Sequence, residues 1–198
     1  MIKSPSLILL LSVLICGSLA ALGNAEADYV DPVDLGLNFT PDFFFAGYLK
    51  SSPESKFFYT YYPSQSHTRK DPVIIWFGSG PGCSSLYSNF YSKGPFILAK
   101  NSSEFRTNPY AWNKNANLIF IESPGTVGFS SGDAKITDLE LANQHLEAIL
   151  SFFSKFPGLK DQDLYLAGEG YAGIYIPYLA NRVTQHNKDP LTLQEEQI

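Results

Sequence analysis

Residues 163–173 read Asp-Leu-Tyr-Leu-Ala-Gly-Glu-Gly-Tyr-Ala-Gly, and they predict a strand that turns sharply into a helix. The segment Asp163–Ala167 is short and apolar enough to form a strand. A helical pattern begins at once, at Tyr171, and continues to Val183. The small residues between the two segments allow strand and helix to pass close together. A strand followed directly by a helix is typical of an α/β sheet.

The turn at Gly168–Ala172 has the build of a nucleophile elbow but carries no nucleophile. In a G-x-S-x-G elbow, a serine sits on a strained turn between strand and helix and exposes its hydroxyl. The central residue here is Gly170, which tolerates the strained backbone and has no hydroxyl. Taken alone, the motif leaves a second interpretation open, which is an ordinary glycine-rich loop.

Three short apolar runs predict strands inside a sheet that is covered on both faces. An amphipathic pattern capped by Thr137-Asp138 predicts a helix that runs to Phe153. The three predicted strands are Pro72–Phe77, Asn117–Glu122 and Asp163–Ala167.

Two aromatic runs, Phe43–Leu49 and Lys56–Tyr62, flank a segment with turn chemistry. This arrangement predicts an antiparallel hairpin. The predicted fold class is therefore α/β, with an N-terminal antiparallel hairpin that leads into a mostly parallel sheet.

A second glycine-rich motif, Gly78–Ser85, follows directly on the predicted strand Pro72–Phe77. Its glycines would let backbone N–H groups point into a site, as in an oxyanion hole. A phosphate-binding loop is the competing interpretation, but the lysine of a Walker motif is missing. Ser84 and Ser85 suit the cap of a helix better than the role of a substitute nucleophile.

These motifs and three further blocks resemble the serine carboxypeptidase family in the order of the family's own blocks. The stretch Trp76–Leu86 looks like the family signature W-L-N-G-G-P-G-C-S-S-L, and Gly168–Gly173 looks like its elbow G-E-S-Y-A-G. The resemblance covers roughly Gly47 to Val183. The further blocks are Gly94–Phe96, Asn108–Asn113 and Glu122–Ser130.

The resemblance implies an α/β-hydrolase fold, truncated here, and a secreted or vacuolar/lysosomal glycoprotein. Family members release C-terminal residues from peptides at acidic pH, and some plant relatives transfer acyl groups instead. By resemblance, Gly80 and Tyr171 supply the backbone N–H groups of the oxyanion hole. Glu169 matches the glutamate that helps to bind the terminal carboxylate of the substrate.

Four positions depart from the family pattern. Gly170 stands in place of the nucleophilic serine, and Ser79 in place of a signature glycine. Gly78 stands where the family has an asparagine that grips the substrate carboxylate, and Ser92 stands in the place of a partner glutamate. We therefore expect a weakened carboxylate site as well as a vacant nucleophile position.

The resemblance also places the triad aspartate and histidine, and the disulfide partner of Cys83, downstream of the elbow, where this chain has none of them. We expect Cys83 to be an orphan. The three histidines, His67, His145 and His186, lack the context of a base, and we predict each to be a surface residue. No ligand spacing supports a metal, and no cofactor is expected.

The first 22 residues predict a secretory signal peptide, which would leave residues 23–198 as the mature domain. A transmembrane anchor is the alternative, but the apolar run is shorter than the roughly 20 residues that a span needs. Two glycosylation sequons, at Asn38 and Asn101, fit secretion. The net charge of −5 and the absence of a basic patch argue against nucleic acid as a partner.

The sequence therefore favours a serine carboxypeptidase-like protein that is inactive because Gly170 replaces the nucleophile and the Asp/His part is missing. A non-catalytic secreted protein that binds peptide C-termini or pairs with a family paralogue is one alternative. An acyltransferase-type relative is another. A third hypothesis is a chain without a stable fold, since half a sheet exposes an edge strand. No membrane association is expected after signal cleavage.

Overall fold

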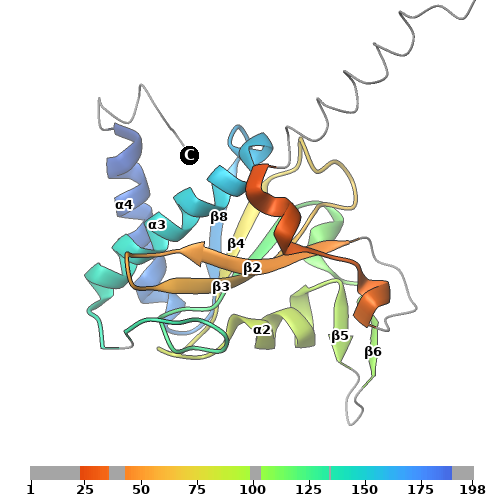
Figure 1. Ribbon diagram of the computed structural model, residues 1–198, viewed down its shortest axis with the longest axis horizontal. Coiled ribbons are helices and arrows are strands. Elements are labelled where there is room, and N and C mark those ends of the chain that lie inside the picture. The colour runs from red at the N-terminus through yellow and green to blue at the C-terminus, as the bar shows by residue number, and fades with distance from the viewer. Residues whose placement is uncertain (1–22, 36–42, 99–103, 134, 189–198) are drawn as a thin grey trace, which may run out of the picture.

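The computed structural model describes residues 23–35, 43–98, 104–133 and 135–188. Within them the chain forms one six-stranded sheet, a small two-stranded hairpin and two long helices (Figure 1). The predicted signal peptide and both sequons, Asn38 and Asn101, lie outside the described residues. In the described ranges, no helix is both long enough and apolar enough to cross a membrane.

The large sheet has the strand order β1-β2-β3-β7-β4-β8. Neighbours from β1 to β7 pair antiparallel, whereas β4 pairs parallel with both β7 and β8. The predicted hairpin and its continuation into parallel strands are confirmed. The strands are β1 (Tyr29–Val30), β2 (Phe44–Lys50), β3 (Lys56–Tyr62), β4 (Val73–Phe77), β7 (Asn117–Ile121) and β8 (Leu164–Gly168).

The short hairpin of β5 (Phe96–Leu98) and β6 (Phe105–Thr107) was not predicted from the sequence. Its strands are three residues each and carry little periodicity. The remaining short elements connect the strands. They are η1 (Gly23–Asp28), η2 (Pro32–Leu35), α2 (Ser85–Ser88), η3 (Asn89–Lys93), η4 (Trp112–Lys114) and η5 (Pro157–Leu159).

The long helices α3 (Asp138–Lys155) and α4 (Ala172–Lys188) pack against each other and against one face of the sheet. The predicted cap of α3 is confirmed, because Thr137 and Glu140 form a reciprocal capping box. On this face the core includes Ile75 and Phe77 of β4 together with Phe152 of α3. α4 continues five residues beyond the predicted end at Val183.

The opposite face of the sheet carries a smaller aromatic core. Trp76 of β4 points to this face, because neighbouring residues of a strand alternate between faces. Phe96 of β5 packs here against Phe44 and Tyr62, with ring centroids 5.7 and 5.5 Å away. The sheet is thus covered on both sides, with α3 and α4 on one side and the α2–β5–β6 region on the other.

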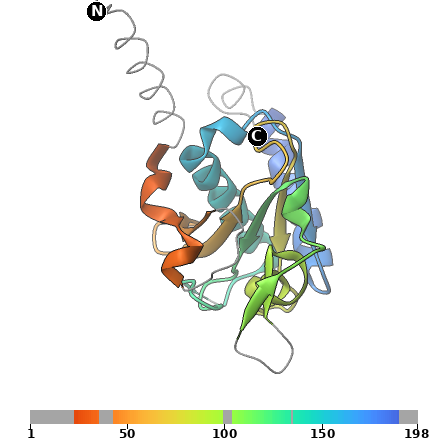
Figure 2. The ribbon, with the colours of Figure 1, turned by 90° about the vertical axis from the view of Figure 1, so that its right-hand side faces the viewer.

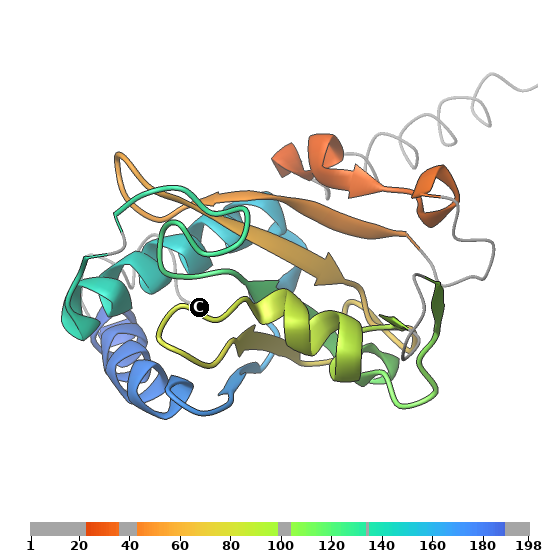
Figure 3. The same cartoon turned by 90° about the horizontal axis from the view of Figure 1, so that it is seen from below.

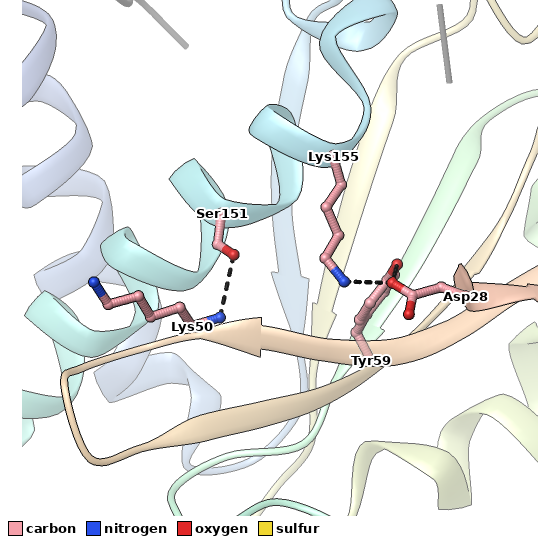
Figure 4. Close-up of polar contacts among 5 residues, drawn as sticks. All are labelled: Asp28, Lys50, Tyr59, Ser151 and Lys155. Atoms are coloured by element: carbon pink, nitrogen blue, oxygen red, sulfur yellow. Dashed lines mark hydrogen bonds and ion pairs between the residues drawn. The ribbon is translucent and has the colours of Figure 1, made fainter. Parts of the chain in front are cut away.

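The N-terminal segment from Gly23 runs along the outer edge of β2, as Figures 2 and 3 show in red and orange. Asp28 fastens it to the sheet and to α3, because its carboxylate accepts a hydrogen bond from Tyr59 at 2.8 Å and pairs with Lys155 (Figure 4). Burial, and then the bond to Asp28, raises the pKa of Tyr59 above its ordinary value. A side chain at Gly47 would collide with the Asp28 carboxylate.

A second contact joins β2 to α3 nearby. The backbone N–H of Lys50 donates to the hydroxyl of Ser151 at 3.1 Å (Figure 4). The two contacts hold the start of the described chain and the end of the hairpin to the same helix.

Candidate functional site

The two glycine-rich loops leave the sheet side by side. In the parallel pair β4–β8, Phe77 lies opposite Gly168, so the loops that follow these residues start from the same edge of the sheet. Figures 1 and 3 show the loop from β4, in yellow, beside the beginning of α4. A side chain at Gly168 would come within 2.5 Å of Cβ of Ala172 and 2.8 Å of the carbonyl oxygen of Phe77. Glycine is therefore required for the close passage of strand and helix.

Gly170 sits at the apex of the turn, with a left-handed φ of +57°. The backbone N–H of Gly173 donates to its carbonyl at 3.1 Å, and α4 begins at Ala172. The residue is exposed and lies at the carboxyl edge of the parallel strands. The predicted sharp turn is confirmed, and its apex has no side chain.

Ser79, from the neighbouring loop, fills the space that a side chain at Gly170 would enter. A Cβ built on Gly170 would collide with the hydroxyl oxygen of Ser79 and would lie 3.2 Å from its Cβ. The Ser79 hydroxyl makes no hydrogen bond within the described part of the chain. Both residues depart from the pattern that the resemblance implies, and the fold brings the two positions against each other.

Gly78 has no room for a side chain either. A Cβ there would come within 2.5 Å of the carbonyl oxygen of Cys83 and 3.0 Å of the backbone nitrogen of Ser85. The loop turns back on itself at this point, and the backbone N–H of Cys83 donates to the carbonyl of Ser79 at 3.1 Å. The asparagine that the resemblance leads one to expect at Gly78 would not fit this loop conformation.

The backbone N–H groups of Gly80 and Tyr171 make no hydrogen bond to any other described residue. Gly80 follows Ser79 and Tyr171 follows Gly170, so each N–H belongs to a residue next to one of the two that lie against each other. Neither N–H depends on a side chain, so both donors survive the substitutions at positions 79 and 170.

Glu169 is exposed beside the apex, and its carboxylate accepts a hydrogen bond of 3.3 Å from the hydroxyl of Ser88. The hydroxyl of Ser92, which by resemblance stands in the place of a partner acid, donates to the backbone carbonyl of Ser88 at 3.0 Å. The contact of Ser88 with Glu169 was not predicted, because Ser88 lies outside the sequence blocks that carry the family resemblance. Its position, one helical turn before Ser92, was the available signal.

The loop after β4 is hydrogen-bonded to a buried carboxylate, that of Glu122. Glu122 is fully buried, accepts a hydrogen bond from the hydroxyl of Ser84, and accepts another from the backbone N–H of Phe129 at 2.8 Å. Ser84 also caps α2, as predicted, by accepting from the backbone N–H of Leu86. Glu122 thus joins the loop that precedes α2 to the segment that follows β7.

His145 corrects the prediction that all three histidines lie on the surface. Its side chain is fully buried, and Nε2 lies 2.7 Å from the hydroxyl oxygen of Ser123. Its ring packs on Phe77 and Tyr175, with centroids 4.6 and 5.8 Å away. Burial lowers the pKa of His145 to about 3, so the ring is neutral at physiological pH. The helix turns this position towards the sheet, because Leu141 and Ile149, four residues away on either side, are buried too.

His67 is exposed, as predicted, whereas His186 is partly buried on α4. No histidine makes a hydrogen bond to Ser79 or to the turn at Gly170 in the part of the chain that the structure describes. Cys83 is exposed and has a free thiol. Among the described residues, no group of three or more His, Cys, Asp or Glu side chains is arranged to hold a metal ion.

Comparison with known proteins finds similarity to one family over most of the chain. The sequence profile described as serine carboxypeptidase matches residues 36–195. The lysosomal protective protein of Mus musculus is 43% identical over 188 residues, which cover 92% of this chain and 38% of that protein. The vacuolar serine-type carboxypeptidase ATG42 of Saccharomyces cerevisiae is 36% identical over 175 residues, which cover 85% of this chain and 34% of that protein.

Among solved structures, the crystal structure of Kex1(delta)p, a prohormone-processing carboxypeptidase from Saccharomyces cerevisiae, is similar to this chain with a TM-score of 0.66. The two are 26% identical, and the match covers 76% of this chain and 37% of the other. The chain spans a little over a third of the length of these relatives.

Proposed function

The chain belongs to the serine carboxypeptidase family, and we propose that it does not release C-terminal residues from peptides, because its elbow lacks the nucleophile. The observation that carries the proposal is Gly170, which stands at the exposed apex of the strand-to-helix turn with a φ of +57°. Hydrolysis by this route needs an oxygen that attacks the peptide carbonyl and forms an acyl-enzyme. Gly170 supplies no such oxygen.

A base is the second requirement of the reaction. An activated serine needs a partner that accepts its proton, and a third group orients that partner. Within the described residues the buried histidine, His145, is hydrogen-bonded to Ser123 and not to either glycine-rich loop. The proposal therefore extends to Ser79, whose hydroxyl makes no hydrogen bond to a base within the described residues.

A second candidate function is non-catalytic binding of peptide C-termini. The observation in its favour is that the backbone N–H groups of Gly80 and Tyr171 are unpaired within the described residues and remain available to a carbonyl oxygen. Glu169 is exposed beside them. An intact family paralogue is a further candidate partner for such a non-catalytic protein. An acyltransferase-type relative remains the other alternative.

We place the protein in the secretory pathway, in the vacuole, the lysosome or outside the cell. The proposal rests on the predicted signal peptide in residues 1–22 and on relatives that are named lysosomal and vacuolar. The two sequons at Asn38 and Asn101 are the predicted sites of glycosylation.

A turnover assay tests the main proposal. The purified chain is incubated with blocked dipeptides at pH values from 4.5 to 7.5, and the released C-terminal amino acid is measured by chromatography. An active serine carboxypeptidase serves as the positive control. We expect release no faster than in buffer; release above that level, abolished by a serine-directed phosphonate, would refute the proposal.

A further inference from the structure

Relative to the pattern that the resemblance implies, serine and glycine are interchanged at two positions of this chain. The loop after β4 carries a hydroxyl, at Ser79, and the elbow has none, at Gly170. Ser79 carries the side chain where the resemblance implies glycine, and Gly170 lacks it where the resemblance implies serine. The two positions belong to different loops, which leave the sheet from the neighbouring strands β4 and β8.

The two positions lie against each other in the structure. A Cβ on Gly170 would point into the Ser79 side chain, colliding with Oγ and lying 3.2 Å from Cβ. Rotation of Ser79 about χ1 would remove the Oγ collision, but the two Cβ atoms would still be closer than ordinary van der Waals contact allows. A third atom, Cα of Ser79, lies 3.9 Å away and does not interfere. The obstruction is therefore confined to the side chain of Ser79.

We infer that Ser79 is a second determinant of the vacant elbow, because its side chain occupies the nucleophile's place and keeps any side chain at position 170 from being presented to a substrate. The inference deepens the proposed function and rests on it, since it concerns the same site. It adds that restoring a side chain at Gly170 is not sufficient to restore an exposed elbow. Ser79 must become glycine at the same time.

A cysteine at the apex measures this presentation without requiring catalysis. The chain's own cysteines are first replaced (Cys16→Ser and Cys83→Ser), and Gly170→Cys is then compared with and without Ser79→Gly. The rate at which the introduced thiol reacts with a disulfide reagent reports its exposure. We expect Ser79→Gly to increase this rate by about tenfold, a factor within the usual range of coupling between contacting residues. Ser79→Ala, which keeps Cβ and removes Oγ, should give an intermediate rate.

Ser66→Cys in the same background is the matched control. Ser66 is exposed in a turn distant in sequence from both loops, so its thiol should react rapidly with or without Ser79→Gly. Thermal unfolding supplies a second measurement. The change in Tm that Ser79→Gly causes should be about 3 °C more positive in the Gly170→Cys chain than in the chain that keeps Gly170.

Equal thiol reactivity in the presence and absence of Ser79→Gly, together with additive shifts in Tm, would overturn the inference. That result would leave the proposed absence of hydrolysis untouched, because Gly170 would still lack a hydroxyl. Peptide release by the unmodified chain would instead refute the proposed function, and it would leave the steric coupling between the two positions as measured.

Discussion

Nε2 of His145 lies 2.7 Å from the hydroxyl oxygen of Ser123, and both side chains are buried. Ser123 follows β7 and His145 belongs to α3, so the bond joins the helix to the carboxyl edge of the sheet. The His145 ring also touches Phe77, the last residue before the first glycine-rich loop. The buried ring of His145 thus packs beneath the end of β4, from which the first glycine-rich loop leaves the sheet.

The burial of His145 predicts a fold that loses stability at acidic pH. The pKa of His145 is lowered by burial to about 3, whereas an unfolded histidine titrates near 6.5, so the unfolded chain binds the extra proton between these values. Stability should therefore fall as the pH falls below about 6.5, with a contribution from this group of at most about 1.4 kcal/mol per pH unit. Urea unfolding between pH 4.5 and 8 measures this slope.

His145→Gln should flatten the slope and lower stability at pH 7 by about 1–3 kcal/mol, because it removes the titrating ring and disturbs a buried hydrogen bond. His67→Gln, at an exposed histidine, is the control and should leave both quantities unchanged. An unaltered pH dependence in the His145→Gln chain would show that another group is responsible.

Asp28→Asn should destabilise the fold by about 1–3 kcal/mol, because Lys155 loses its charge partner in a largely buried pair. Lys155→Met and the double variant complete a cycle in chemical unfolding. We expect the double variant to cost less than the sum of the single ones. Asp161→Asn, at an exposed position, is the matched control. Additive effects would mean that the pair contributes nothing as a pair.

Glu122→Gln should loosen both segments that its carboxylate joins. The Glu122 carboxylate accepts hydrogen bonds from the hydroxyl of Ser84 and the backbone N–H of Phe129. The amide of glutamine would place its NH₂ group against one of these donors, and a buried polar group left without a partner costs about 1–3 kcal/mol. Hydrogen exchange should accelerate in peptides covering residues 78–85 and 123–130. Glu147→Gln on the exposed face of α3 is the control. Unchanged exchange in these two peptides would contradict the role assigned to Glu122.

Gly170→Ser should cost at least about 1 kcal/mol, because the new side chain meets both a left-handed backbone and the side chain of Ser79. It should also give no peptide release, since no histidine is hydrogen-bonded to either loop in the described residues. Gly158→Ser is the matched control, because a Cβ there would meet open space. Measurable turnover in the Gly170→Ser chain would reveal a base elsewhere in the protein.

Local patterns were sufficient to predict the strand-turn-helix unit at Gly170, the strand Lys56–Tyr62 and the capping of α3 by Thr137. These features depend on residues close in sequence, where periodicity and turn chemistry act directly. The burial of His145 was also within reach, because Leu141 and Ile149 lie on the same face of the helix. The prediction failed there because a polar residue was assumed to face solvent.

Contacts between distant segments were beyond sequence reasoning. The collision between Ser79 and a side chain at Gly170 depends on how two loops, 91 residues apart, leave adjacent strands. The attachment of Asp28 to Lys155 spans 127 residues. The sequence showed that Ser79 and Gly170 both depart from the family pattern, but it did not show that one occupies the other's space.

We expect that no residue of this chain acts as a nucleophile at the elbow, and intact-mass spectrometry after treatment with a serine-directed phosphonate tests this most directly. An active serine carboxypeptidase, treated in parallel, should gain the mass of one adduct. We predict that this chain, at the same pH and reagent concentration, gains none. An adduct at a single residue, whether at Ser79 or at another hydroxyl, would contradict the claim and identify the nucleophile.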